Sequence, residues 1–338
     1  MYQERKNFYR ELEEKRQSKL LIYITGDREN RQTQISHDVI DLFVNHLDSI
    51  GDVDKLSLYL YTTGGITSAA WTLVNLIKQF CKEFELIVPR KAHSAGTLIC
   101  LGADKIVMTK QATLGPIDPS VNTPLNPVGN TDIMQKNTVP VSVEDINAYL
   151  DGAKRHLGEK TDLTEIFSLL SEEVHPLVLG KTFRIRDQIR MLGKRLLSAL
   201  DTDERTIDRI LEFLCSESGS HDYTINRNEA KDLQLPIIKP HEDEYNIIKK
   251  IYDDISEELE LTVPYNHQTI LGSQKEKGYK LKLALLESLS GGSHSFISKG
   301  TLRKKTYQMK SGLQGTAIEE DTEYIRWERM EAGENEKQ

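Results

Sequence analysis

Short apolar runs alternate with helical segments through the first third of the chain. The apolar runs are typical of buried strands and occupy residues 20–25, 56–61, 84–89 and 105–109. Helices are predicted between and after them, at 38–50, 67–80 and 94–101. This alternation predicts βαβ units and therefore an α/β fold built on a parallel sheet. Ligand sites in such sheets lie at the carboxyl ends of the strands.

Helices dominate the middle of the chain, and short strands return toward its end. Five prolines predict a rigid loop over residues 116–140. Helices are predicted at 142–157, 162–173, 178–200, 203–216 and 242–258, and strands at 223–225, 235–238, 268–271, 279–286 and 296–298. The last 24 residues are rich in acids and poor in apolar groups, which predicts a frayed end.

These patterns suggest three parts. Residues 1–17 are predicted to form a charged helix, residues 18–240 the α/β core, and residues 241–338 a small accessory α+β module with an acidic tail. The apolar face of the first helix is thin, and this predicts that the helix is too weakly held by its own core and packs between subunits. We therefore expect a homo-oligomer with closed symmetry.

Composition narrows the class of function. The chain has 338 residues, of which 38% are hydrophobic and 28% charged, and its net charge of −8 argues against a nucleic-acid partner. Its apolar runs are shorter than the roughly 20 residues of a membrane span, and the charged first residues do not resemble a signal peptide. Cys81, Cys100 and Cys215 lack metal or disulfide spacing, which suits reduced thiols in the cytoplasm. We expect neither a metal nor a cofactor, because phosphate-loop and paired metal-ligand motifs are missing.

Two small-residue motifs follow predicted strands and suggest acyl-transfer chemistry. The first is Tyr61-Thr-Thr-Gly-Gly-Ile66, and the second is Lys91-Ala-His-Ser-Ala-Gly-Thr97. A hydroxyl nucleophile needs a tight turn with small neighbours, and backbone amides must point at the developing oxyanion. Ser94 is the candidate nucleophile, with the amide of Ala95 as one donor and that of Gly64 or Gly65 as the other. Either motif taken alone can also be a helix cap or a simple turn.

Several motifs in the same order resemble the Clp-fold serine proteinases, most closely the serine dehydrogenase proteinase (SDH) branch. They are Thr63-Gly-Gly65, Ser94-Ala-Gly-Thr-Leu-Ile, Gly102-Ala-Asp-Lys-Ile-Val-Met108, Leu114-Gly-Pro-Ile-Asp-Pro119, His175-Pro-Leu-Val-Leu-Gly180, Ser220-His-Asp-Tyr-Thr-Ile225 and Glu229-Ala-Lys-Asp-Leu233. The resemblance covers residues 18–238. It implies a Clp protease/crotonase-like core, a nucleophile at Ser94 and self-assembly. For the oxyanion donors inferred from the motifs, we expect Gly65 and Ala95.

The general base is the open question of this resemblance. In Clp proteases a histidine lies where this chain has Ile117 or Asp118, and no histidine occurs between His93 and His156. The resemblance therefore favours His221, in the Ser-His-Asp-Tyr motif, as the base.

Other residues are candidates for orienting the base or for acting as the base themselves. Asp118 or Asp222 would orient His221. In the stomatin-operon proteases, which are more distant relatives, a lysine takes the part of the base. Here that position falls near Val141, with Lys136 closest to it and Lys154 one helix later. His93 is adjacent to Ser94, and neighbouring side chains on a turn diverge. We therefore expect His93 to form part of the pocket wall rather than to act as the base.

The expected function is hydrolysis of a peptide or protein substrate through an acyl-enzyme on Ser94. Two alternatives stay open. An inert scaffold of the same fold would bind peptides or a partner protein without cutting them. A crotonase-like acyl-CoA enzyme would use the same two amides, but the sequence has no evident basic patch for CoA.

Overall fold

The computed structural model describes residues 1–117, 120–129, 138–158, 162–199, 202–217, 223–308 and 314–330. The chain divides into two compact units. The first unit joins Met1–Thr113 to Pro236–Gln338, and the second is Leu114–Leu235. The division differs from the expected boundaries at 17/18 and 240/241, because the C-terminal elements pack with the first 113 residues.

The first unit contains an eight-stranded mixed sheet in the order β10-β5-β3-β2-β1-β11-β12-β13. Its helices are α1 (Tyr2–Arg16), α2 (Ile40–Ile50), α3 (Thr67–Phe80), α4 (Ala95–Leu101), α10 (Glu242–Glu258) and α11 (His267–Leu271), with a 3₁₀ turn at His37–Val39. Its strands are β1 (Lys19–Thr25), β2 (Val53–Tyr61), β3 (Cys81–Val88), β4 (Lys91–Ala92), β5 (Lys105–Met108), β10 (Ile237–Ile238), β11 (Glu276–Ser288), β12 (Gly292–Gln308) and β13 (Gln314–Arg329). β6 (Thr113–Leu114) lies at the boundary between the units.

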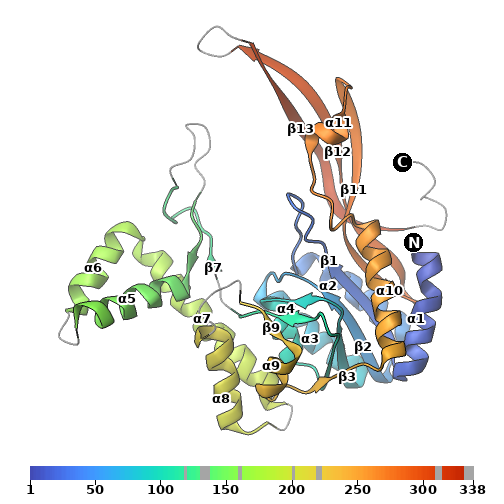
Figure 1. Ribbon diagram of the computed structural model, residues 1–338, viewed down its shortest axis with the longest axis horizontal. Helices are drawn as coiled ribbons and strands as arrows, with labels where there is room; N and C mark the ends of the chain where they lie inside the picture. The colour runs from blue at the N-terminus through green and yellow to red at the C-terminus, as the bar shows by residue number, and fades with distance from the viewer. Residues whose placement is uncertain are drawn as a thin grey trace. The chain divides into compact units, whose positions relative to one another are not determined.

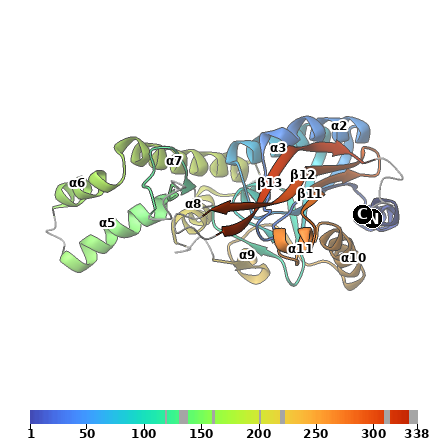
Figure 2. The same cartoon turned by 90° about the horizontal axis from the view of Figure 1, so that it is seen from above.

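The α/β class and the parallel core are confirmed. β1, β2, β3, β5 and β10 run parallel, with Leu21 opposite Leu58 and Leu58 opposite Leu86. Figures 1 and 2 show α2 and α3 on one face of this sheet and α1 and α10 on the other. Burial on both faces explains why the sequence runs of these strands are mainly apolar rather than alternating.

The first helix is held within its own unit, contrary to expectation. Tyr9 and Leu12 of α1 are buried in a core cluster that includes Ile248 and Ile251 of α10. Arg5 is 0% exposed and donates to Glu287 of β11 at 2.8 Å. The predicted reason for self-assembly, a helix too weakly held by its own core, is therefore wrong.

The C-terminal strands extend the main sheet. β11 pairs antiparallel with β1, so that Leu21 lies opposite Ser288, and β12 and β13 continue outward. We call β11, β12 and β13 the C-terminal ribbon; its far end projects beyond the helices in Figure 1. The strands expected at 279–286 and 296–298 fall within β11 and β12, whereas 268–271 lies in helix α11.

The acidic end is more ordered than its composition predicts. Residues 315–329 lie in β13, where basic side chains of β12 and β11 pair with its acids. Lys299 contacts Glu323 at 3.0 Å and Lys280 contacts Glu328 at 3.2 Å. The prediction of fraying is wrong for this strand.

The second unit is mainly helical. Its elements are β7 (Ser120–Val121), β8 (Val141–Ser142), α5 (Val143–Leu157), α6 (Leu163–Glu173), α7 (Pro176–Ser198), α8 (Glu204–Glu212), a π-helical turn at Phe213–Glu217, β9 (Ile225–Asn226) and α9 (Arg227–Asp232). Val121, Val141 and Val178 belong to its core cluster. The helices predicted in this region are present; the segment expected to be loop also contains β7.

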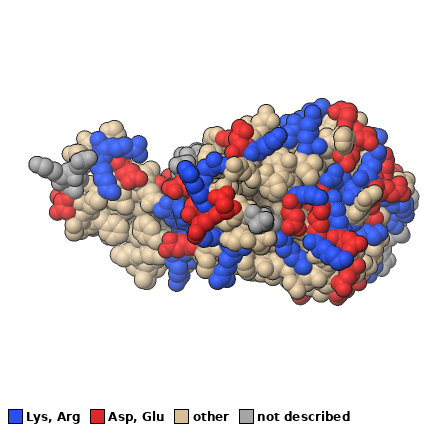
Figure 3. All heavy atoms as spheres, turned by 90° about the horizontal axis from the view of Figure 1, so that it is seen from below, with Lys and Arg blue, Asp and Glu red and all other residues tan. Residues whose placement is uncertain are grey.

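Charged side chains of both signs cover the face seen in Figure 3, where Lys and Arg lie among Asp and Glu. Within the described residues, none of the helices combines the length and apolar character that crossing a bilayer requires.

Candidate active site

Ser94 sits on a strained turn between β4 and α4. Its φ of 51° and ψ of −113° fall in a region that residues with a Cβ rarely adopt. Such a conformation costs on the order of 1–3 kcal/mol and persists only where the surrounding structure imposes it. Ser94 caps α4 without a side-chain hydrogen bond, so its hydroxyl does not satisfy the helix.

The diglycine after β2 lies against this turn. A Cβ at Gly64 would come within 2.8 Å of Ser94 Cβ and 3.2 Å of Ser94 Oγ. Gly64 also has a φ of +123°, which favours glycine. Both observations explain why a residue without a side chain occupies this position.

Thr62 ties the two motifs together, a role that the sequence analysis missed. Its backbone pairs with the nucleophile segment on both sides, since Thr62 N–H donates to Lys91 O at 3.0 Å and His93 N–H donates to Thr62 O at 3.1 Å. Its Oγ1 accepts from the amide of Gly64 at 3.0 Å and from Thr25 Oγ1 at 2.7 Å. Two threonines, Thr62 and Thr63, precede the diglycine in the sequence, and the pattern alone does not say which of them makes these contacts.

The two amides proposed as oxyanion donors have no acceptor in the part of the chain that the structure describes. Ala95 is the first residue of α4, and its amide precedes the helical hydrogen bonds. Of the two glycines, Gly64 has its amide bound to Thr62, whereas the amide of Gly65 makes no such bond among the described residues. The geometry therefore favours Gly65 over Gly64 as a donor.

Ile35 fixes the position of Gly65 from the opposite side. Its amide donates to Gly64 O and its carbonyl accepts from the amide of Ile66, both at 2.8 Å. A Cβ at Gly65 would lie 2.3 Å from Ile35 O, so this approach also requires glycine. Nothing in the sequence pattern indicated that residue 35 would contact this motif.

The side chain of His93 contacts Thr113. Its Nε2 lies 2.9 Å from Thr113 Oγ1, and Gly96 N–H donates to its carbonyl at 2.8 Å. The ring is thus anchored to the segment after β5.

The structure does not test the predicted general bases or the carboxylates predicted to orient His221. Asp118, Lys136, His221 and Asp222 lie outside the described residues. Lys154 belongs to α5 of the second unit, where its side chain is exposed. All five assignments therefore remain predictions.

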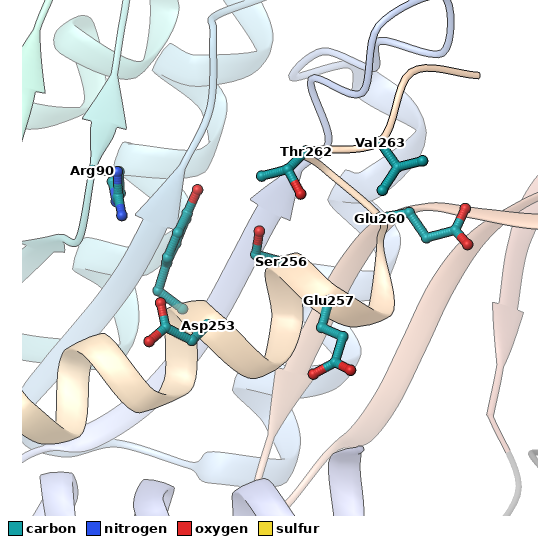
Figure 4. Close-up of a pocket in the computed structure, with 8 residues that line it drawn as sticks. Arg90, Asp253, Ser256, Glu257, Glu260, Thr262 and Val263 are labelled. Carbon is teal, nitrogen blue, oxygen red and sulfur yellow. The ribbon is translucent and has the colours of Figure 1, made fainter. Parts of the chain in front are cut away.

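A pocket of about 500 Å³ opens beside α10 in the first unit (Figure 4). Asp253, Ser256 and Glu257 of α10 line it, and Arg90 lines it from another segment. Ser94, Gly65 and Ala95 do not line it. The pocket is thus separate from the Ser94 turn.

Candidate metal ligands do not gather in the described part of the chain, where no group of three His, Cys, Asp or Glu side chains is placed to hold an ion. The three cysteines are free thiols.

This arrangement agrees with the family comparison. Residues 1–146 match the ClpP-like SDH-type serine proteinase family. The resemblance to SDH proteinases is thereby confirmed for this part of the chain, which carries Gly65, Ser94 and Ala95. The SDH-type match ends before the motifs at 175–180, 220–225 and 229–233.

Two curated proteins of Methanocaldococcus jannaschii are similar to this chain. The uncharacterized protein MJ0137 is 27% identical over 197 residues, which is 58% of this chain and 58% of that protein. The uncharacterized protein MJ1495 is 36% identical over 66 residues, 20% of this chain and 23% of that protein. The chain thus spans less than two thirds of either relative.

Two solved structures are distantly similar. The membrane-bound stomatin-specific protease 1510-N is 17% identical with a TM-score of 0.39, over 67% of this chain and 78% of that one. ClpP1 from Listeria monocytogenes is 15% identical with a TM-score of 0.37, over 69% of this chain and 99% of that one. Likenesses this low do not support a transfer of function.

Proposed function

We propose that this protein is a serine peptidase that hydrolyses peptide bonds through an acyl-enzyme on Ser94. The observation that carries the proposal is the Ser94 turn itself. It presents a hydroxyl that does not cap its helix, on a strained backbone, with Gly64 packed directly against it. A residue held in a sparsely allowed conformation is typical of active sites.

The amides of Gly65 and Ala95 would stabilise the tetrahedral intermediate. Both lack an acceptor in the described structure and both belong to segments fixed by Thr62. Preorganised donors of this kind are worth on the order of 10²–10³-fold in rate each. The family match over residues 1–146 supports the same assignment.

Proton transfer from Ser94 requires a base. We propose His221 for this role, with Asp118 or Asp222 as its orienting carboxylate, and Lys136 and then Lys154 as the competing assignments. The proposal rests on the sequence resemblance alone.

We also propose a homo-oligomer, now on the family resemblance only, because α1 is buried in its own unit. The free thiols favour the cytoplasm as the compartment. Sedimentation at micromolar concentration tests the first of these proposals, and a monomer would contradict it.

Hydrolysis of an unfolded protein and of quenched fluorescent peptides tests the function. The purified protein should cleave them, and Ser94→Ala should lower the rate by several orders of magnitude. An inert scaffold would bind the peptides and leave both proteins without turnover. A crotonase-like enzyme would instead consume an acyl-CoA thioester.

A further inference from the structure

The loop between β1 and α2 connects the Ser94 region to the C-terminal ribbon. We call residues 26–36 the β1–α2 loop. Its inner end is Ile35, which exchanges two backbone hydrogen bonds with Gly64 and Ile66, each 2.8 Å long. Ile35 thus holds the backbone on both sides of Gly65.

The same loop also reaches the segment that carries the nucleophile. The carboxylate of Asp27 accepts from Lys91 Nζ at 2.6 Å and from Tyr61 Oη at 2.8 Å. Lys91 lies three residues before Ser94, and Tyr61 ends β2. Burial and the Asp27 charge raise the pKa of Tyr61, which stays a neutral donor. One loop therefore contacts both halves of the site.

The loop has few internal contacts, chiefly the backbone hydrogen bonds from Arg31 N–H to Arg28 O at 2.9 Å and from Thr33 N–H to Gly26 O. Residues 27–34 are mainly polar and form neither helix nor strand. At its base, the amide of Gly26 donates to Leu283 O of β11 at 2.9 Å, and Thr33 N–H donates to Gly26 O at 2.8 Å. Order in such a segment comes from tertiary contacts.

The outer part of the loop is clamped by the C-terminal elements. Arg31 forms an ion pair with Glu320 of β13, and its guanidinium lies 3.9 Å from the ring centroid of Tyr265. Tyr265 N–H donates to Glu29 O at 3.1 Å, and Asn30 Nδ2 donates to Tyr265 O at 3.2 Å. These contacts join the loop to the ribbon and to the segment between α10 and β11.

Glu320 is well placed to act as the fixed end of this clamp. His267 Nε2 lies 2.9 Å from its second oxygen, so both carboxylate oxygens are engaged. Burial alone would raise the pKa of Glu320, but hydrogen bonds from Arg31, Tyr279 and His267 outweigh it and lower that pKa to about 2. Glu320 is therefore charged at neutral pH, and its side chain is only 18% exposed.

We infer that Arg31 and Glu320 are positioning residues for the amide of Gly65, and that the C-terminal ribbon is a working part of the active site. The inference rests on the proposed function, in which Gly65 supplies an oxyanion donor. Releasing Glu320 would loosen the β1–α2 loop and, through Ile35, let Gly65 drift from its position. Because the oxyanion forms only after attack on the peptide carbonyl, displacement of Gly65 should lower kcat and leave KM nearly unchanged.

Glu320→Gln tests this with little change of shape, and Glu323→Gln is the matched control. Glu323 lies on the same strand and pairs with Lys299 at 3.0 Å, away from the loop. Glu320→Gln should lower kcat about 10-fold with KM almost unchanged, a fraction of what a lost oxyanion donor costs. Hydrogen exchange of the Ile35 and Ile66 amides should quicken about 10-fold, while amides of β2 keep their protection. Glu323→Gln should change neither kcat nor the exchange of these amides.

The exchange measurement separates this inference from the proposed function. If wild-type protein proves inactive but Glu320→Gln still quickens exchange at Ile35 and Ile66, the coupling stands and the peptidase assignment fails. If an active enzyme keeps its kcat and its exchange in Glu320→Gln, the positioning role is wrong. An equal rise in exchange across β2 would also contradict it, because that result marks general destabilisation.

Discussion

The amide of Gly64 donates to Thr62 Oγ1 at 3.0 Å, so that among the described residues only Gly65 of the pair has an amide without an acceptor. Thr62 Oγ1 also donates to Gly64 O at 3.2 Å and accepts from Thr25 Oγ1. One buried hydroxyl therefore fixes the diglycine turn, while the backbone of the same residue pairs with Lys91 and His93 just before Ser94.

Thr62→Val should damage the site more than it damages the fold. Valine keeps the methyl group next to Gly96 but leaves the Gly64 amide buried without an acceptor, which costs about 1–3 kcal/mol. We expect kcat to fall at least about 10-fold, in line with partial loss of an oxyanion donor. Thr62→Ser retains the hydroxyl and should recover most of the rate. Equal activity in both variants would show that the hydroxyl plays no part.

Substitutions at Ser94 should separate strain from catalysis. Ser94→Ala and Ser94→Gly both remove the hydroxyl and should both abolish turnover. Only glycine relieves the φ of 51°, so Ser94→Gly should be about 1 kcal/mol more stable to urea than Ser94→Ala. Ser94→Ala should match the wild type within about 0.5 kcal/mol, because no side-chain cap is lost. Identical urea midpoints for the alanine and glycine variants would argue against strain at this turn.

The pH dependence of the hydrolysis rate and three alanine substitutions identify the base. A histidine base titrates near pH 6.5, so the rate should rise through that region and then level off. His221→Ala should then be as harmful as Ser94→Ala, and the double variant no worse, because the pair acts as a unit. If Lys136→Ala or Lys154→Ala shows this pattern while His221→Ala keeps its activity, a lysine is the base.

Stability should fall as pH drops below about 6.5, owing to a buried histidine. His46 Nδ1 lies 2.8 Å from Ser288 Oγ and Nε2 lies 2.9 Å from His294 Nδ1. The pKa of His46 is lowered to about 3, mainly by burial and further by the nearby charges of His294 and Arg329. The unfolded chain binds this proton near pH 6.5 and the folded chain does not, so between pH 6.5 and 3 the folded state loses up to about 1.4 kcal/mol per pH unit.

Urea unfolding at pH 7, 6 and 5 measures this slope, with His46→Gln as the comparison. The free energy of unfolding should decline less steeply in His46→Gln than in the wild type. The pKa of His294 is also lowered, by burial and by Arg329, so part of the slope should remain. Parallel slopes in the two proteins would contradict the assignment to His46.

The fold was predictable where the sequence pattern is local. β1, β2 and β3 are buried on both faces, which leaves a mainly apolar run in each, interrupted only by the buried Ser57 of β2 and Glu85 of β3. The ribbon was harder, because the charges on β13 are neutralised across paired strands, as Glu323 is by Lys299 of β12, and a local pattern does not reveal that pairing. The short helix α11 was taken for a strand, although Asn266 caps it by accepting from Gln268 and Thr269.

The site was predictable where a motif carries it. Ser94, Ala95 and the diglycine stand out because small residues cluster after predicted strands. Thr62 and Ile35 do not stand out, because their contacts with the glycines form only when the folded backbone brings these segments together. Arg31 and Glu320 are 289 residues apart, and no pattern along the chain relates them.

Covalent labelling of Ser94 tests the central claim most directly. The purified full chain is treated with a fluorophosphonate, whose phosphorus is attacked by an activated serine hydroxyl with loss of fluoride, and the modified peptide is located by mass spectrometry. We predict one adduct, on Ser94, that is absent from Ser94→Ala and from protein unfolded before treatment. A wild-type protein that stays unlabelled, or labels at another serine, would contradict the account.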